Sequence, residues 1–212
     1  PKTEGDGAIQ DGAAISIVNR TGYKGLGEIA VTGGTFTAKS GNAAIKAYDW
    51  QGKTESNFTA NGKVSVTGGT FSRAVPDNCC APGFEPTQNE DGTYGVKIMA
   101  NLAAEVLDAQ GNTVGAYDTL TAAITAAQDG DTIKLLKNVD LSSLLEIKKD
   151  LTLDLGGKKL SCNGSVLDIY NDVTIQSGTI ETTFAGEGSK AAVWVNGTAK
   201  LTVESNVTMS TT

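Results

Sequence analysis

The six residues Val-Thr-Gly-Gly-Thr-Phe occur twice in the chain, at Val31–Phe36 and again at Val66–Phe71. Each copy completes a run in which a small residue lies between two apolar ones, Ile29–Val31 in the first copy and Val64–Val66 in the second. Such alternation is typical of a half-buried strand, and a pair of glycines permits a sharp turn with positive φ. The same turn at the same phase of the pattern indicates that one structural unit is repeated.

Further copies of the pattern lie in the second half of the chain, at Leu151–Leu153, Val173–Ile175 and Leu201–Val203. In four units another short strand precedes this one, at Ile15–Ile17, Ile45–Ala47, Leu167–Ile169 and Val193–Val195. The length of the unit, roughly 25–35 residues, is within the range of solenoid repeats. A single unit cannot bury its apolar face, so stacked units share one continuous core. We therefore expect an all-β solenoid, with a β-sandwich of coincidentally similar strands as the alternative.

The repeated units fall into two sets, separated by a turn-rich segment that contains hairpin signals. We expect residues 1–75 to be the last coils of one module and residues 76–100 to form an exit turn and a capping hairpin. Residues 101–212 are expected to start a second module, with another hairpin, a capping helix at 118–128 and coils at 131–212.

The segment 118–128 has the one convincing helical pattern in the sequence. Its apolar residues fall at i, i+3, i+4 and i+7 and form a single stripe, made of Leu120, Ala123, Ile124 and Ala127. Asp118 or Thr119 is suited to cap the N-terminus of this helix, and Gly130 is suited to cap its C-terminus. A helix placed just before the first strand covers the open apolar end of a solenoid.

The composition argues against several functional classes. Among 212 residues, 17 are basic and 24 are acidic, and the net charge of −7 argues against nucleic-acid binding. The chain has no histidine, which is the commonest general base and metal ligand, and we expect neither a metal nor a cofactor. No apolar run reaches the roughly 18–20 residues of a membrane span. The three cysteines, Cys79, Cys80 and Cys162, leave both a vicinal disulfide and free thiols open.

Several stretches resemble the large repetitive surface proteins of gut anaerobic bacteria, which are similar to pectate-lyase-like right-handed parallel β-helices. The resemblance covers nearly the whole chain and is clearest at Val66–Phe71, Phe84–Val96, Asp131–Leu136 and Leu151–Gly157. It implies a right-handed parallel β-helix in an extracellular protein associated with the cell surface or cell wall. No catalytic residue is carried over, because neither Arg20 nor Arg73 lies in a recognisable motif of the lyases.

The outward positions of the first strand of each unit are expected to stack into columns. One column consists of Ser16, Lys46, Asp168 and Trp194, and its neighbour consists of Val18, Tyr48, Tyr170 and Asn196. Exposed aromatic rings among polar groups suit carbohydrate stacking or a protein hot spot. The candidate ligand-binding residues are therefore Lys46, Tyr48, Trp50, Asp168, Tyr170 and Trp194. The alternative is an ordinary surface ladder that only stabilises the sheet.

The sequence favours a structural and adhesive module without enzymatic activity. Its partners would be a glycan or a host surface protein. The chain begins and ends within the repeated pattern, so open solenoid ends are expected to pair head to tail, within one chain or between copies. The alternatives are a carbohydrate-binding module and a polysaccharide-acting lyase or hydrolase on the same scaffold. A hydrolase needs two facing carboxylates about 5–9 Å apart, for which Asp49 and Asp168 are the only pair worth testing.

Overall fold

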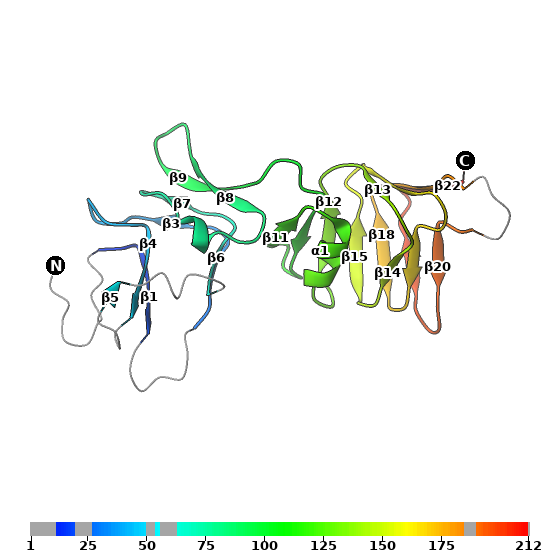
Figure 1. Cartoon of the computed structure of the whole chain (residues 1–212), viewed down its shortest axis with the longest axis horizontal. Helices are drawn as coiled ribbons and strands as arrows, with labels where there is room; N and C mark the ends of the chain where they lie inside the picture. Colours follow the sequence, from blue (N-terminus) through cyan, green and yellow to red (C-terminus); the bar gives the residue numbers. More distant parts are fainter. Residues whose placement is uncertain (1–11, 20–26, 50–53, 56–62, 185–189, 212) are drawn as a thin grey trace. The chain divides into compact units, whose positions relative to one another are not determined.

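The computed structural model of the chain describes residues 12–19, 27–49, 54–55, 63–184 and 190–211 (Figure 1). The chain divides into two compact units, Pro1–Met99 and Ala100–Thr212, and each has its own hydrophobic core. Both units consist mainly of short β-strands, many of them paired in parallel, and the described residues contain one α-helix. The expectation of an all-β fold is therefore confirmed.

Unit 1 contains three sheets whose first strands pair in parallel. Their strands are β1 (Ile15–Asn19), β4 (Ile45–Asp49) and β5 (Thr54–Glu55) in one sheet, β2 (Ile29–Val31) and β6 (Val64–Val66) in another, and β3 (Thr35–Phe36), β7 (Thr70–Phe71), β9 (Tyr94–Ile98) and β8 (Phe84–Gln88) in the third. A short 3₁₀ helix, η1 (Asp77–Cys79), precedes the β8–β9 hairpin, which the sequence had predicted. We call one strand from each sheet, taken in chain order, a rung, so that β1, β2 and β3 form the first rung.

The two Val-Thr-Gly-Gly-Thr-Phe stretches lie side by side in register in unit 1. Val31 is opposite Val66 in the β2–β6 pair, and Phe36 is opposite Phe71 in the β3–β7 pair. The two phenylalanine rings stack with their centroids 4.8 Å apart. Between the strands, the N–H of Thr70 donates to the carbonyl oxygen of Gly34 at 2.8 Å. The repeated stretch is therefore the same corner on two consecutive rungs, as its phase predicts.

Three of the four glycines at this corner are required, for two different reasons. The second glycine of each copy, Gly34 or Gly69, has a φ of +96° or +101°, which only glycine adopts without strain. The first glycine of the second copy, Gly68, lies against the preceding rung, and a Cβ atom there would be 2.4 Å from the carbonyl oxygen of Thr32. At Gly33, its counterpart one rung earlier, a Cβ atom would have nothing within 4 Å.

Unit 2 begins with an antiparallel hairpin and continues as three parallel sheets. The hairpin strands β10 (Ala104–Leu107) and β11 (Thr113–Tyr117) extend the sheet of β12 (Thr132–Leu135), β15 (Leu151–Asp154), β18 (Val173–Gln176) and β21 (Leu201–Val203). The second sheet contains β13 (Val139–Leu141), β16 (Lys159–Cys162), β19 (Gly178–Thr182) and β22 (Val207–Thr211). The third contains β14 (Leu145–Ile147), β17 (Leu167–Ile169) and β20 (Val193–Val195). The chain visits the three sheets in turn, and Figure 1 shows the strands of successive rungs side by side.

The core of unit 2 is formed by aliphatic side chains that repeat from rung to rung. Leu153 and Ile175 occupy the same position on β15 and β18, and Leu160 and Ile180 occupy the same position on β16 and β19. All four are completely buried. Because each fully buried aliphatic side chain contributes about 1.5–3 kcal/mol, this column of like residues is the main stabilising feature of the unit.

The charged residues that precede the strands form a ladder of hydrogen bonds at one corner of unit 2. A carboxylate oxygen of Asp129 accepts the backbone N–H of Asp150 at 3.1 Å, and Asp150 accepts that of Asp172 at 2.9 Å. Asp172 in turn accepts the N–H of Lys200 at 2.9 Å. Carboxylates make strong hydrogen bonds to backbone N–H groups, so these residues fix the alignment of successive rungs.

The helix α1 (Leu120–Ala126) is shorter than the predicted segment 118–128. Thr119 caps its N-terminus by accepting the N–H of Ala122, as expected for one of the two candidate caps. The prediction that Gly130 caps the C-terminus is wrong, because the helix already ends at Ala126 and Ala127 is its C-terminal cap. The ammonium group of Lys149 explains the early end, since it donates to the carbonyl oxygens of Ile124, Thr125 and Ala127 at 2.9, 2.8 and 2.5 Å. These carbonyls have no partner further along the helix, and a cation at this end is favourable.

All three cysteines are free thiols, so no vicinal disulfide is present. Cys79 and Cys162 are buried. Burial raises the pKa of the Cys79 thiol to about 11, and it raises that of Cys80 to about 11 with help from the nearby charge of Asp77. At neutral pH both thiols are therefore protonated and poorly nucleophilic.

The Gly68→Ala substitution is expected to destabilise unit 1, because the new methyl group collides with the backbone of the preceding rung. Overpacking of this kind typically costs about 1–3 kcal/mol. The matched control is Gly33→Ala, the same corner one rung earlier, where the methyl group meets nothing and the effect should be small. Urea unfolding followed by far-UV circular dichroism measures both, and equal midpoints for the two variants would contradict the close approach of the rungs.

Candidate functional site

The outward side of the β14–β17–β20 sheet carries three of the six residues predicted as a site, Asp168, Tyr170 and Trp194. The register places Glu146 beside Asp168 and Asp168 beside Trp194. Side chains alternate between the two faces of a strand, so the residues two positions further on share this side. We call the set the outer ladder; its members are Glu146, Lys148, Asp168, Tyr170, Trp194 and Asn196. The inward residues of the same strands, such as Leu167 and Ile169, are completely buried.

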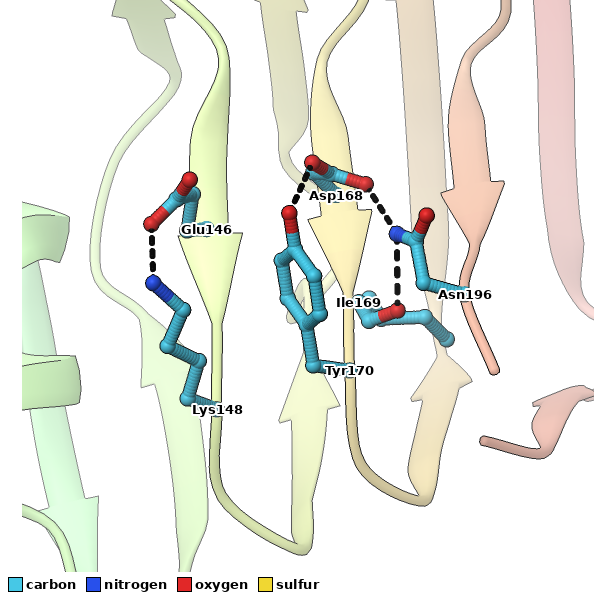
Figure 2. A network of polar contacts seen from close by, with 6 residues as sticks. All are labelled: Glu146, Lys148, Asp168, Ile169, Tyr170 and Asn196. Carbon is cyan, nitrogen blue, oxygen red and sulfur yellow. Dashed lines mark hydrogen bonds and ion pairs between the residues drawn. The ribbon is translucent and has the colours of Figure 1, made fainter. Parts of the chain in front are cut away.

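Asp168 is the centre of the hydrogen bonds in the outer ladder (Figure 2). One carboxylate oxygen accepts the phenol O–H of Tyr170 at 3.0 Å, and the other accepts the side-chain N–H of Asn196. The same amide nitrogen of Asn196 donates to the carbonyl oxygen of Ile169 at 3.2 Å. The carboxylate thus joins the β17 and β20 strands and holds the Tyr170 ring against the sheet.

The Tyr170 ring is held from two sides and remains 42 % exposed. Its hydroxyl is bound to Asp168, and the ammonium group of Lys148 lies 5.2 Å from the ring centroid, within the range of a cation–π contact. Lys148 also forms an ion pair of 2.6 Å with Glu146. The hydrogen bond to Asp168 is the main reason why the pKa of the Tyr170 phenol is raised above its ordinary value of 10.0, with a smaller effect of nearby negative charge.

Trp194 is fixed by a different residue, Ser165, which lies just before β17. The indole N–H donates to the hydroxyl oxygen of Ser165 at 2.8 Å, and the backbone N–H of Ala191 donates to the same oxygen at 3.2 Å. The ring is nevertheless 41 % exposed. Asp168 is opposite Trp194 in the register and is bonded to Tyr170, so the carboxylate and the two rings belong to neighbouring positions of one sheet.

The other predicted site residues belong to unit 1. Lys46 and Tyr48 lie on β4, opposite Ser16 and Val18 on β1, so the predicted register of these strands is confirmed. The prediction also combined them with Asp168 and Trp194 in one column, but the two sets lie in different units, which do not share a sheet. Trp50 lies outside the described residues.

The carboxylate pair suggested for a hydrolase is divided in the same way. Asp49 ends β4 in unit 1, and Asp168 lies on β17 in unit 2. The two residues belong to different sheets, and no strand pairing among the described residues joins them.

Sequence reasoning missed Glu146, Lys148 and Ser165. The first two lie on or just after β14, which was not recognised as a strand although Leu145-Glu-Ile147 has the alternating pattern. Its place one rung before Leu167–Ile169 is the signal that could have identified it. Ser165 lies before β17, outside the alternating pattern of that strand, so no sequence signal points to it.

The last rung of unit 2, formed by β20, β21 and β22, is a second surface of interest. Its inward side chains Val195, Val203 and Met209 are 47 %, 43 % and 36 % exposed. Their register partners one rung earlier are all completely buried; these are Ile169, Ile175 and Ile180. The position is the same and the side chains are equally apolar, and among the described residues no further rung lies on this one.

Within the described ranges, no helix is long and apolar enough to cross a membrane. The same residues contain no cluster of three or more His, Cys, Asp or Glu side chains that could hold a metal ion.

The hydrogen bond between Tyr170 and Asp168 predicts an unusual titration. The pKa of the Tyr170 phenol is raised above its ordinary value of 10.0, so the phenol should lose its proton only above pH 10. The bond therefore contributes fully to the stability of the folded chain below pH 10, and this contribution is lost as the pH rises through the raised pKa. The Asp168→Asn substitution removes the negative charge and should lower this pKa towards the ordinary value. The absorbance of tyrosinate, followed as the pH is raised, measures the pKa of Tyr170. The Tyr170→Phe variant shows which part of the absorbance change comes from this residue.

The control is Asp172→Asn, which removes a carboxylate from the corner next to β18, where it is bound to Lys200 rather than to Tyr170. If Asp168→Asn moved the Tyr170 titration no more than Asp172→Asn does, the bond would not be the cause of the raised pKa.

Comparison of the chain with protein-family models, with curated proteins and with solved structures gives no match.

Proposed function

We propose that this chain is an extracellular structural and adhesive repeat module of a bacterial surface protein, with no catalytic role. We further propose that its parallel sheets are the faces of a right-handed parallel β-helix. The observation that carries both proposals is the stacking of β15, β18 and β21, in which like residues align position by position, as Thr152, Thr174 and Thr202 do. Right-handed crossovers are the rule between parallel strands, which supports the handedness.

The distribution of stabilising contacts supports a structural role. Burial of the aliphatic columns is the main source of stability, whereas exposed ion pairs such as Lys148–Glu146 contribute little. Outward residues can therefore vary between rungs without loss of the fold, which suits a scaffold that displays different surfaces. The extracellular location rests on the resemblance of the repeated stretches to bacterial surface proteins.

In a β-helix each rung contacts only its neighbours, so protection against hydrogen exchange should be graded along unit 2. We expect the amides of β15 and β18 to exchange slowest and those of β20, β21 and β22 to exchange fastest. Hydrogen exchange of the full chain, followed by mass spectrometry, measures this order. Uniform protection of all these strands, as expected for a single closed core such as a β-sandwich, would contradict the proposal.

Carbohydrate binding at the outer ladder is the second candidate function. The exposed rings of Trp194 and Tyr170, each held by a hydrogen bond, favour it together with the Asp168 carboxylate that is bonded to Tyr170. Flat apolar rings stack on sugar faces, and a carboxylate accepts hydrogen bonds from sugar hydroxyls. Because the rings are already immobilised, binding would cost little side-chain entropy.

If the outer ladder binds a glycan, Trp194→Ala and Tyr170→Ala should each weaken binding by about tenfold or more. Tyr170→Phe keeps the ring and should retain most of the affinity. The matched control is Val114→Ala, which changes an exposed apolar residue of β11, away from the ladder. Isothermal titration with polygalacturonate and with mucin oligosaccharides measures the affinities. If all variants bound the glycan equally, its binding site would lie outside the outer ladder. The ladder would then have a structural role only.

A further inference from the structure

Lys148 shows how the outer ladder holds an ammonium group (Figure 2). Its Nζ forms an ion pair of 2.6 Å with the carboxylate of Glu146, and it lies 5.2 Å from the centroid of the Tyr170 ring on the next rung. The hydrogen bond to Glu146 is the main reason why the pKa of the Lys148 ammonium is raised above its ordinary value. A carboxylate and an aromatic ring from neighbouring rungs therefore form an ammonium site, which the chain fills with its own lysine.

The next rung has the carboxylate of such a site without the lysine. Asp168 is the register partner of Glu146. The residue two positions after it is Tyr170, whereas the residue two positions after Glu146 is Lys148. Both hydrogen bonds to the Asp168 carboxylate come from neutral groups, the phenol of Tyr170 and the amide of Asn196. In the part of the chain that the structure describes, no ion pair forms with Asp168, so no cation in contact with it compensates its charge.

The Asp168 carboxylate can accept further hydrogen bonds from a ligand. The side chain is half-buried, and a carboxylate offers about four lone-pair sites, of which the neighbouring residues use two. A hydrogen bond to a carboxylate is stronger when the donor is also charged, and bonds with ionised groups are roughly twice as strong as those between neutral groups. Among the donors that a ligand can offer, an ammonium group therefore gains most at Asp168.

An aromatic ring is available beside this carboxylate as well. Trp194 is opposite Asp168 in the register of β17 and β20, and its indole ring is exposed. Tryptophan has the ring that attracts cations most strongly, and its flat apolar face also suits the face of a sugar. Neighbouring strands lie about 4.7–4.9 Å apart, so a single sugar residue is long enough to reach both side chains.

The charges of the chain favour a cationic ligand over an anionic one. The net charge of the whole chain is −7. Lys148, the one cation of the outer ladder, is already paired with Glu146. The carboxylates of a uronic acid polymer would therefore meet the charge of Asp168 without an unpaired cation of the ladder to receive them, and like charges at an interface suppress binding.

We propose that the outer ladder binds oligosaccharides whose sugars carry free amino groups, with a sugar ring on Trp194 and its ammonium group on Asp168. The proposal rests on the second candidate function, carbohydrate binding at the outer ladder, and names the class of sugar. Ser165 holds the indole, and Tyr170 and Asn196 hold the carboxylate, so both groups are in place before the ligand arrives. Asp168 determines which sugars bind, whereas the ring of Trp194 contributes to the binding of all of them.

Isothermal titration of the full chain with three oligosaccharides of equal length tests the proposal. These are oligomers of glucosamine, of N-acetylglucosamine and of galacturonic acid, in a mildly acidic buffer that keeps the sugar amines protonated. We expect the glucosamine oligomer to bind at least about tenfold more tightly than the acetylated one, and the galacturonic acid oligomer to bind most weakly. High salt should reduce the preference for glucosamine, because screening weakens the pairing of charges.

The Asp168→Asn substitution removes the charge and keeps the size of the side chain. It should bring the affinities for the glucosamine and N-acetylglucosamine oligomers to within about twofold of each other. Trp194→Ala should weaken the binding of both oligomers alike. The matched control is Asp172→Asn, which removes a carboxylate that lies outside the outer ladder and is bonded to the backbone of Lys200, and it should keep the preference. Circular dichroism checks that the variants are folded.

Two results would overturn the proposal and leave carbohydrate binding at the ladder standing. One is equal binding of the amino and acetylated oligomers by the unchanged chain, with Trp194→Ala weakening both. The other is a preference for glucosamine that Asp168→Asn retains in full. If Asp168→Asn does not fold, the salt series decides, and a preference that is the same at low and high salt would overturn the proposal.

A chain that binds none of the three oligomers would contradict both this proposal and the second candidate function. Graded hydrogen exchange in the same sample would then still support the proposed structural role, so the failure of one proposal is distinguishable from the failure of the other.

Discussion

The backbone hydrogen bond from one rung to the next is the constraint on which the rest of the structure depends. From β15 to β18 and from β18 to β21 it runs forward along the chain, from Leu151 to Asp172 and from Val173 to Lys200, whereas from β19 to β16 it runs back, from Thr179 to Lys158. Since the stacked strands are only two to five residues long, a slip of one residue would turn every inward side chain outward. The corner carboxylates and the close approach at Gly68 both prevent such a slip.

This constraint separates what stabilises the fold from what can serve a function. Inward positions must be apolar and of similar size on every rung, and losing a buried Leu or Ile typically costs about 2–5 kcal/mol. Outward positions contribute far less, so Asp168, Tyr170 and Trp194 are not needed to bury the core. Their fixed geometry comes from contacts between outward side chains and with Ser165, and the outer ladder can therefore differ from one rung to another.

Much of the strand framework could be predicted from the sequence, because the alternating pattern and the glycine turn are local signals. The alignment of the two Val-Thr-Gly-Gly-Thr-Phe stretches predicts the register of β2 with β6 that the structure has. The helix end could not be predicted, because it depends on Lys149, a residue from a later loop. The strand β14 was missed because its short pattern is followed at once by Lys148, Lys149 and Asp150, which suggest a loop.

The candidate site was predicted only in part. The pairing of Asp168 with Trp194 follows from aligning two copies of the repeat, but the hydrogen bonds of Ser165 and Asn196 depend on side-chain directions that no pattern encodes. Combining Lys46 with Asp168 failed for a different reason, since an alignment of repeats does not distinguish copies in one unit from copies in another.

Nuclear magnetic resonance of the full chain can establish whether the rungs stack in parallel. We expect close contacts between the backbone protons of Thr152 and Thr174, and between those of Thr174 and Thr202. An antiparallel pairing of β15 with β16, which follow one another in the sequence, would contradict the parallel stacking. Such contacts would show that the strands form hairpins rather than stacked rungs.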